Sequence, residues 1–82
     1  MFELEWKESA TKDLGKLERN ISSRIYKKVD CLRQGFKSKD IKRLKGSNDF
    51  RLRVGDYRVL FSFSGNVLIV WKVGHRKKIY RR

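Results

Sequence analysis

The spacing of hydrophobic residues changes along the first part of the chain. In residues 2–6 apolar residues alternate with glutamates, which is the period of a half-buried strand. From residue 9 onward, apolar residues recur every three or four positions, as they do on the buried face of a helix. This spacing predicts helices over residues 9–19 and 22–34, with Ser9 as the N-cap of the first and Gly35 at the C′ position of the second.

The second half of the chain returns to the period of a strand. A polar connector over residues 37–49 has room for one brief strand, and three alternating segments follow, joined by turns at Gly55-Asp56 and Ser64-Gly65-Asn66. The order β-α-α-β-β-β predicts one α+β domain over residues 1–82, with a helical hairpin on a mainly antiparallel sheet. The predicted core packs Phe50, Leu52, Val54, Val59 and Phe61 of the sheet against Leu14, Leu17, Ile25, Val29 and Leu32 of the helices.

The first turn sets the positions of three arginines. A two-residue turn at Gly55-Asp56 places Arg53 opposite Arg58, and Arg51 lies one pleat along on the same face. Like charges directly opposite each other destabilise a sheet, and residues 50–63 contain a single acidic side chain to offset them. Because guanidinium groups bind phosphate bidentately, we interpret the three arginines as a phosphate site. The alternative is that they only solvate the outer face of the sheet.

The sequence allows two registers for the second hairpin, which differ by one residue. A two-residue Gly65-Asn66 turn places Trp71 on the arginine face, where an exposed indole can stack on a base. A three-residue loop places Lys72 there and directs Trp71 into the core. Of these two arrangements, we expect the buried tryptophan.

Composition narrows the class of protein. The 82 residues carry 22 basic against 9 acidic side chains, a net charge of +13, and 39% of them are hydrophobic, which argues for a folded domain that binds a polyanion. The chain starts with acidic residues and has no apolar run long enough to cross a membrane, so we expect a cytoplasmic protein without membrane contacts. One cysteine and one histidine exclude an internal disulfide and cannot by themselves form a zinc site, and we expect neither metal nor cofactor.

The last nine residues, GHRKKIYRR, place chemically useful side chains among cations. A histidine can exchange a proton near neutral pH, a tyrosine can do so beside cations, and an arginine can hold the charge that develops on a phosphate. The segment offers one candidate for each role: His75, Tyr80 and Arg76. Ile79 adds an apolar anchor. These residues indicate a functional segment, and the alternative is a frayed basic terminus.

Two stretches resemble a known family. The stretch KRLKG-(x)₃-FRLRVGDYRVLF at residues 42–61 and VGHRKKIY at residues 73–80 are similar to the RelE/ParE superfamily of toxin–antitoxin toxins, and most similar to its RelE-type members. The resemblance covers the whole chain and agrees with the predicted fold. It implies a metal-independent endoribonuclease that cuts mRNA in the ribosomal A site by attack of a ribose 2′-hydroxyl on the adjacent phosphodiester.

The resemblance also implies roles for individual residues. RelE-type toxins use basic residues on two central strands, an arginine after the last strand and a tyrosine near the C-terminus. This chain has arginines at the first two of these positions, where lysines occur in the family, and arginine does not release its proton. Proton transfer would then fall to the histidine or the tyrosine. The expected catalytic residues are Arg51, Arg53, Arg58, His75, Arg76 and Tyr80, and the expected RNA-binding residues are Lys42, Arg43, Lys45, Lys72, Lys77 and Lys78.

Three partners follow from this resemblance: the ribosome, mRNA and an acidic antitoxin of the RelB type that wraps the toxin, with the helices over residues 9–34 as its docking platform. Two other functions stay open. A ParE-like toxin shares the fold and inhibits DNA gyrase without cutting RNA. A non-catalytic RNA- or ribosome-binding module would need only the positive charge.

Overall fold

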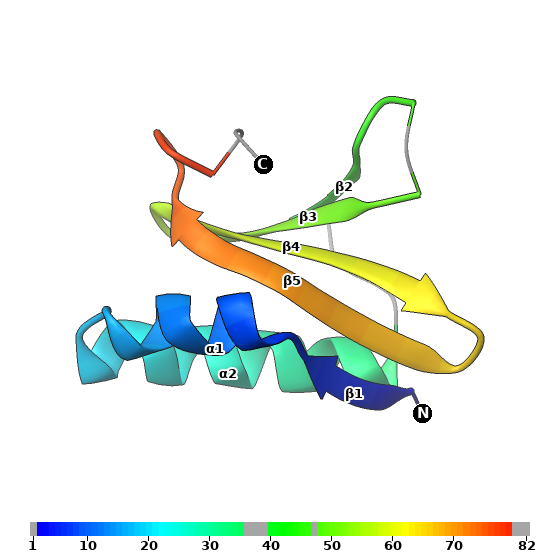
Figure 1. Cartoon of the computed structure of the whole chain (residues 1–82), viewed down its shortest axis with the longest axis horizontal. Coiled ribbons are helices and arrows are strands. Elements are labelled where there is room, and N and C mark those ends of the chain that lie inside the picture. Colours follow the sequence, from blue (N-terminus) through cyan, green and yellow to red (C-terminus); the bar gives the residue numbers. More distant parts are fainter. Residues whose placement is uncertain (1, 36–39, 47, 80–82) are drawn as a thin grey trace.

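The computed structural model describes residues 2–35, 40–46 and 48–79, and it contains a five-stranded sheet with two helices on one face (Figure 1). The strand order is β1-β5-β4-β3-β2, with β1 parallel to β5 and the other neighbours antiparallel. This arrangement confirms the predicted α+β fold. The elements are β1 (Glu3–Trp6), α1 (Glu8–Gly15), α2 (Arg19–Gln34), β2 (Ile41–Arg43), β3 (Phe50–Val54), β4 (Tyr57–Ser64) and β5 (Val67–His75).

The two helices divide the chain differently from the prediction. The first ends at Gly15 instead of residue 19, because glycine is a poor helix former and offers no side chain to pack there. The second begins at Arg19, three residues before the predicted start, and the carbonyl of Glu18 accepts hydrogen bonds from the amides of Ile21 and Ser22. The helical hairpin itself is confirmed.

Both predicted helix caps are wrong. The N-cap of α1 is Lys7, which forms no side-chain cap, and the Ser9 hydroxyl instead donates to the carbonyl of Trp71 at 2.6 Å. A tertiary contact therefore replaces a local one. Gly35 does follow α2, but its φ of 179° is extended backbone instead of the left-handed conformation of a C′ glycine.

The predicted register of the β3–β4 hairpin is confirmed. Leu52 pairs with Val59 and Arg53 pairs with Arg58, around a two-residue turn in which Gly55 has a φ of 59°. A side chain at that φ would be strained, so the turn requires glycine. The brief strand expected in the polar connector is β2, which pairs antiparallel with β3.

The β4–β5 hairpin contains an irregularity that overturns the expected position of Trp71. Its turn has two residues, but a bulge between Leu60 and Phe61 adds one residue to β5, so Trp71 and Lys72 both lie opposite Leu60. Trp71 is 40% exposed, and its indole N–H donates to the hydroxyl of Ser62 at 2.6 Å. The prediction of a core tryptophan is therefore wrong.

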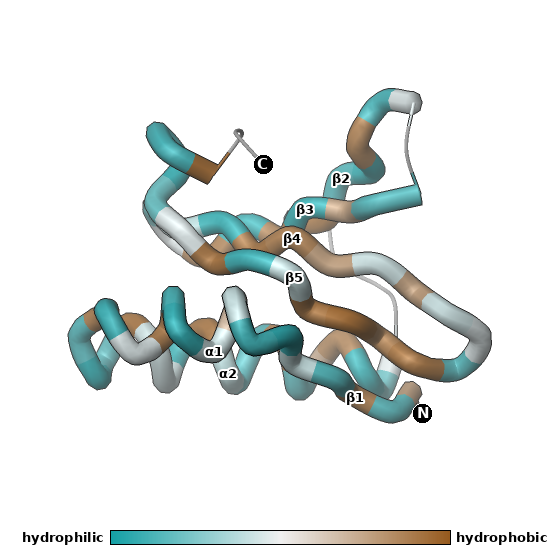
Figure 2. The backbone as a smooth tube through the Cα atoms, in the orientation of Figure 1, coloured by the Kyte–Doolittle hydropathy of each residue, from teal (hydrophilic) through white to brown (hydrophobic). Residues whose placement is uncertain are grey.

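The main core lies between the helices and the inner face of the sheet. Hydrophobic residues concentrate in β4 and β5, whereas the helices alternate hydrophilic and hydrophobic positions (Figure 2). Leu17 and Phe50 are half-buried, and the other eight residues of the predicted core are buried. In the described ranges, neither helix is long and apolar enough to cross a membrane.

Phe61 is the largest fully buried side chain in the part of the chain that the structure describes, and it stacks on Phe50 with ring centroids 5.5 Å apart. We expect Phe61→Ala to lower the free energy of unfolding by about 3–5 kcal/mol, because the lost contacts leave a cavity. Urea denaturation measures the change. Tyr26→Ala, which truncates a residue that is 48% exposed, is the matched control and should cost less. Equal losses in the two variants would contradict the assigned core.

Candidate nucleic-acid interface

Four cationic residues share the outer face of the sheet, away from the helices. Strand pairing places Lys42 opposite Arg51 and Arg53 opposite Arg58, so both pairs project from the same side. Together with Asp40 they line a hollow of about 170 Å³, which we call the arginine hollow. The three arginines predicted to form a phosphate site are therefore brought together.

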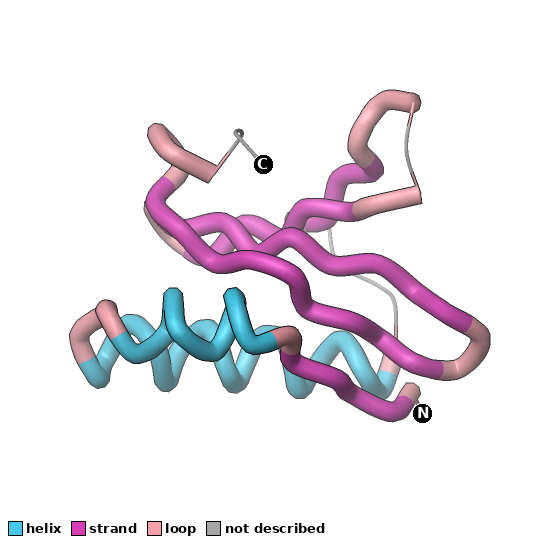
Figure 3. The backbone as a smooth tube through the Cα atoms, in the orientation of Figure 1, coloured by secondary structure: helices cyan, strands magenta, loops and turns pink. Residues whose placement is uncertain are grey.

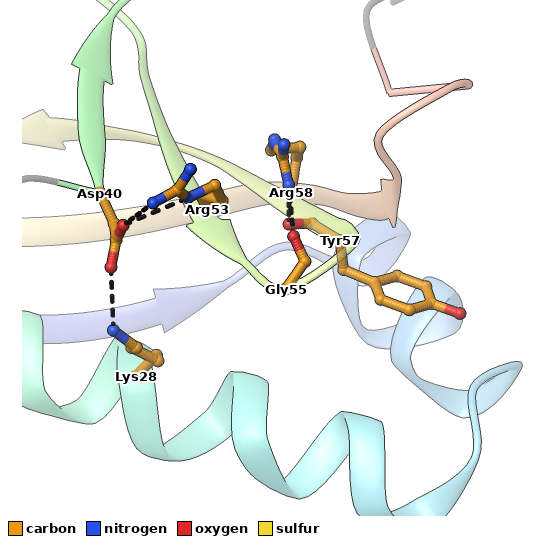
Figure 4. A network of polar contacts seen from close by, with 6 residues as sticks. All are labelled: Lys28, Asp40, Arg53, Gly55, Tyr57 and Arg58. Carbon is orange, nitrogen blue, oxygen red and sulfur yellow. Dashed lines mark hydrogen bonds and ion pairs between the residues drawn. The ribbon is translucent and has the colours of Figure 1, made fainter.

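Asp40 is the acidic member of this hollow, and sequence reasoning missed it. Its Oδ1 accepts bonds from Arg53 Nε at 3.2 Å and Nη2 at 2.9 Å, and its Oδ2 accepts one from Lys28 Nζ at 3.2 Å (Figure 4). These hydrogen bonds from Lys28 and Arg53 lower the pKa of Asp40. The carboxylate is therefore charged at neutral pH, and its contribution to stability is lost only as the pH falls through that lowered pKa.

Arg58 is held against its own turn. Its Nη1 donates to the carbonyls of Gly55 at 2.8 Å and Tyr57 at 2.9 Å (Figure 4). The Nε–H is buried and has no acceptor within the described ranges. A buried donor without an acceptor costs free energy, and hydrogen bonds between charged groups are stronger than those to neutral carbonyls. Arg58 therefore has donor capacity that a phosphate can use once the side chain turns toward it.

A larger groove adjoins the arginine hollow. It has a volume of about 660 Å³ and is lined by Arg53, Arg58 and Arg76, together with residues of α2. The amide of Arg76 donates to the carbonyl of Asp56 at 2.8 Å, which ties the chain after β5 to the β3–β4 turn. Arg76 Nε lies 4.0 Å from the carboxylate of Asp56. The predicted arginine after the last strand therefore lies near the strand arginines.

His75 faces the opposite side of the sheet from Arg58 and the other strand arginines. It pairs with Tyr57, whose ring lies on the helix-facing side of the sheet, and the two rings meet edge to face with centroids 5.5 Å apart. Its Nδ1 accepts a hydrogen bond from the amide of Lys77 at 3.2 Å. The bulge in β5 causes this placement, because the added residue moves Gly74, instead of His75, onto the face of Arg58.

The segment after β5 returns over the outer face. Ile79 is fully buried, and a Cβ added to Gly74 would lie 3.2 Å from Ile79 Cδ1. Because Gly74 pairs with Arg58, this contact lies on the arginine-bearing face. Ile79 therefore anchors the segment there, as its apolar character suggested. Tyr80, the next residue, lies outside the described residues, so its predicted catalytic role is untested.

The predicted RNA-binding residues surround the outer face at several points. Arg43 and Lys45 line a hollow of about 620 Å³ at the β2–β3 loop, where Arg43 Nη2 donates to Asn48 Oδ1 at 3.1 Å. Lys77 and Lys78 are exposed in the segment after β5. Figure 3 shows this segment and the β2–β3 loop on the side of the sheet away from the helices. Lys42 and Lys72 project from the face between them.

A family model described as the ParE toxin of type II toxin–antitoxin systems, parDE, matches residues 4–80. The chain belongs to the RelE/ParE toxin superfamily. Toxin RelE3 of Methanocaldococcus jannaschii is 48% identical to this toxin over 42 residues, a match that covers 50% of this chain and 48% of that protein. The match thus spans about half the length of the curated relative.

Solved structures extend the similarity to nearly the whole toxin. A chain of the RelB–RelE antitoxin–toxin complex from Methanococcus jannaschii is 32% identical, with 93% of this chain and 94% of that chain covered and a TM-score of 0.79. A chain of the archaeal RelE–RelB complex from Pyrococcus horikoshii OT3 is 25% identical. The match covers 94% of this chain and 97% of that chain, with a TM-score of 0.78. The isolated Escherichia coli RelE toxin is 22% identical and shares the fold. The match covers 98% of this chain and 92% of that chain, with a TM-score of 0.79. This chain is therefore a type II toxin of the RelE type.

Proposed function

We propose that this toxin is a metal-independent endoribonuclease that enters the ribosomal A site and cuts mRNA there. The observation that carries the proposal is the convergence of Arg51, Arg53, Arg58 and Arg76 on two adjoining cavities of the outer face. Such a cluster stabilises a phosphate that gains negative charge during a reaction. The similarity to RelE toxins supports the reaction class.

The proposed reaction is an in-line displacement at phosphorus. The ribose 2′-oxygen loses its proton and bonds to the adjacent phosphorus, while the bond from phosphorus to the 5′-oxygen of the next nucleotide breaks and that oxygen gains a proton. Arg58 and Arg76 hold the non-bridging oxygens, and Arg51 and Arg53 add to the positive field. The ribosome supplies orientation, which accounts for several kcal/mol of such barriers.

Proton transfer is assigned to Tyr80 in this proposal. The arginines remain charged at physiological pH and cannot act as bases. Ile79, the residue before Tyr80, is anchored on the arginine-bearing face, whereas the ring of His75 packs on Tyr57 on the other face. The placement of these neighbours supports the tyrosine over the histidine.

The variant His75→Gln tests whether the histidine, instead of the tyrosine, transfers the proton. We expect the variant to cleave mRNA within about threefold of the wild-type rate, well short of the 10²–10⁴-fold typical of a lost general acid or base. Glutamine keeps a hydrogen-bonding side chain but cannot titrate. Single-turnover cleavage on programmed ribosomes across a range of pH is the measurement. A cleavage rate two orders of magnitude lower, with the pH profile of the rate flattened near neutrality, would assign proton transfer to His75.

The proposed partners are the ribosome, mRNA and an antitoxin of the RelB type. The solved structures from Methanococcus jannaschii and Pyrococcus horikoshii are complexes of RelE with RelB, which supports such a partner for this toxin. The net charge of +13 suits an acidic segment of that antitoxin. Covering the arginine hollow with carboxylates would block phosphate binding.

A second function has one observation in its favour, because the matching family model is described by the ParE toxin. A ParE-like toxin would inhibit DNA gyrase and leave mRNA intact. Induction of the toxin in a host strain, followed by primer extension on a translated message, separates the two. The ribonuclease proposal predicts discrete cuts that disappear when the start codon of the message is removed. Intact message with arrested replication would contradict it and favour gyrase.

A further inference from the structure

Helix α2 presents a row of cations to the β3–β4 turn. Arg24, Lys27 and Lys28 are spaced three and four residues apart, so they share one face of the helix. All three line the groove of about 660 Å³ that adjoins the arginine hollow. Arg24 Nη2 lies 3.6 Å from the position a Cβ would take on Gly55, which places that guanidinium beside the turn. The proposed reaction makes no use of this row.

The charges of the groove are unbalanced. Its lining contains six cationic side chains and two carboxylates. Asp40 is engaged by Lys28 and Arg53, and Asp56 faces Arg76. Arg24 and Lys27 have no acidic partner within the part of the chain that the structure describes. Like charges held together without counter-charges destabilise a fold, so this arrangement points to an anionic ligand.

The groove is continuous with the arginine hollow, because Asp40, Arg53 and Arg58 line both. Figure 4 shows the connection, with Lys28 reaching up from α2 to the carboxylate that also holds Arg53. A polyanion that binds in the hollow and extends beyond it can therefore enter the groove directly. Positively charged grooves that follow the backbone are the usual means by which proteins hold single-stranded nucleic acid.

We propose that the groove between α2 and the β3–β4 turn binds a second backbone phosphate of the RNA strand whose scissile phosphate occupies the arginine hollow. This inference rests on the proposed ribonuclease function. Arg24 and Lys27 contact the second phosphate, and Arg53 and Arg58 lie between the two positions. RNA fits better than an acidic peptide because one strand supplies phosphates to both cavities in succession, and guanidinium groups line both.

The test compares two double variants that lose the same charges. Arg24→Gln/Lys27→Gln changes the groove, and Lys16→Gln/Arg19→Gln removes one lysine and one arginine from exposed positions outside it. Binding is measured by fluorescence anisotropy with a 2′-O-methyl RNA oligonucleotide, which cannot be cut by 2′-hydroxyl attack. Salt titration reports the number of phosphates neutralised, at a log–log slope of about −0.7 for each in a single strand.

We expect the groove variant to bind several-fold more weakly, with a slope shallower by about 0.7. The control should keep the wild-type slope, and Arg24→Lys/Lys27→Arg should restore it. Thermal melting curves monitored by circular dichroism confirm that each variant is folded. A wild-type slope in the groove variant, or equal losses in both double variants, would overturn the second phosphate site. Unchanged RNA binding with weakened capture of a RelB-type antitoxin would also overturn it, in favour of an acidic peptide.

Failure of this inference is distinguishable from failure of the proposed function. Cleavage of unmodified mRNA on ribosomes is measured for the same proteins. Cleavage by the wild type, together with an unchanged slope in the groove variant, rejects the second phosphate site alone. A wild type that binds the oligonucleotide and leaves mRNA intact rejects the ribonuclease, whatever the groove contributes.

Discussion

Arg58→Ala is expected to lower the single-turnover rate of mRNA cleavage by roughly 10²–10³-fold, the usual cost of removing a donor that stabilises developing charge. Arg58 pairs with Arg53 at the centre of the outer face and lines both cavities. Its Nε–H also has no acceptor among the described residues, so a phosphate adds a bond where the protein supplies none. The assay uses ribosomes programmed with a defined message and toxin in excess.

The same substitution removes two hydrogen bonds to the turn carbonyls, so stability must be measured alongside the rate. Arg58→Lys keeps the charge and loses the planar fork, and we expect its rate to lie between those of wild type and alanine. Arg19→Ala removes an exposed arginine at the start of α2 and should cleave normally. A folded Arg58→Ala variant that cleaves as fast as Arg19→Ala would contradict the assigned site.

Tyr80→Phe is expected to slow cleavage by roughly 10²–10⁴-fold with little change in binding. The substitution removes a hydroxyl and keeps the ring, so an effect confined to the rate identifies a role in proton transfer. Arg76→Ala should differ in kind. Its charge acts on the ground state as well as the transition state, and its loss should weaken substrate binding and slow the reaction together.

The two effects are separated by measuring the single-turnover rate against toxin concentration. The plateau reports the chemical step and the half-saturation point reports binding. A near-wild-type plateau for Tyr80→Phe, together with a normal rate for His75→Gln, would leave arginine electrostatics and geometry as the whole mechanism. If Arg58→Ala and Arg76→Ala also left toxicity intact, the ribonuclease assignment would be abandoned.

Local patterns predicted the fold and the arrangement of the strand arginines in the candidate site. The alternating period over Phe50–Val54 and the glycine of the following turn were enough to place Arg53 opposite Arg58. A two-residue turn with Gly55 at a positive φ fixes the register of everything next to it. Three of the six expected catalytic residues were therefore brought together by a rule that needs no tertiary information.

The features that the sequence did not predict depend on a strand irregularity and on tertiary hydrogen bonds. The spacing of hydrophobic residues indicates neither of them. The bulge that exposes Trp71 and turns His75 to the Tyr57 face is a one-residue irregularity, and it lets Val70 and Val73 both reach the core. Asp40 joins the site from a polar connector through bonds to Lys28 and Arg53, which lie 12 and 13 residues away and on different elements. Ser9 had a local capping role available but bonds to β5 instead.

Whether the toxin cuts mRNA by 2′-hydroxyl attack is tested with purified ribosomes, a defined mRNA and the wild-type toxin. The buffer holds magnesium in excess over EDTA, so that the ribosomes stay intact while the chelator removes transition metals. A message with a single 2′-deoxy nucleotide immediately 5′ of the scissile phosphate serves as the control, because it lacks the attacking hydroxyl. We expect one cut at the A-site codon of the unmodified message, with a 5′-hydroxyl on the downstream fragment, and no cut at that position in the deoxy message. Equal cleavage of both messages, or no cleavage of either, would contradict it.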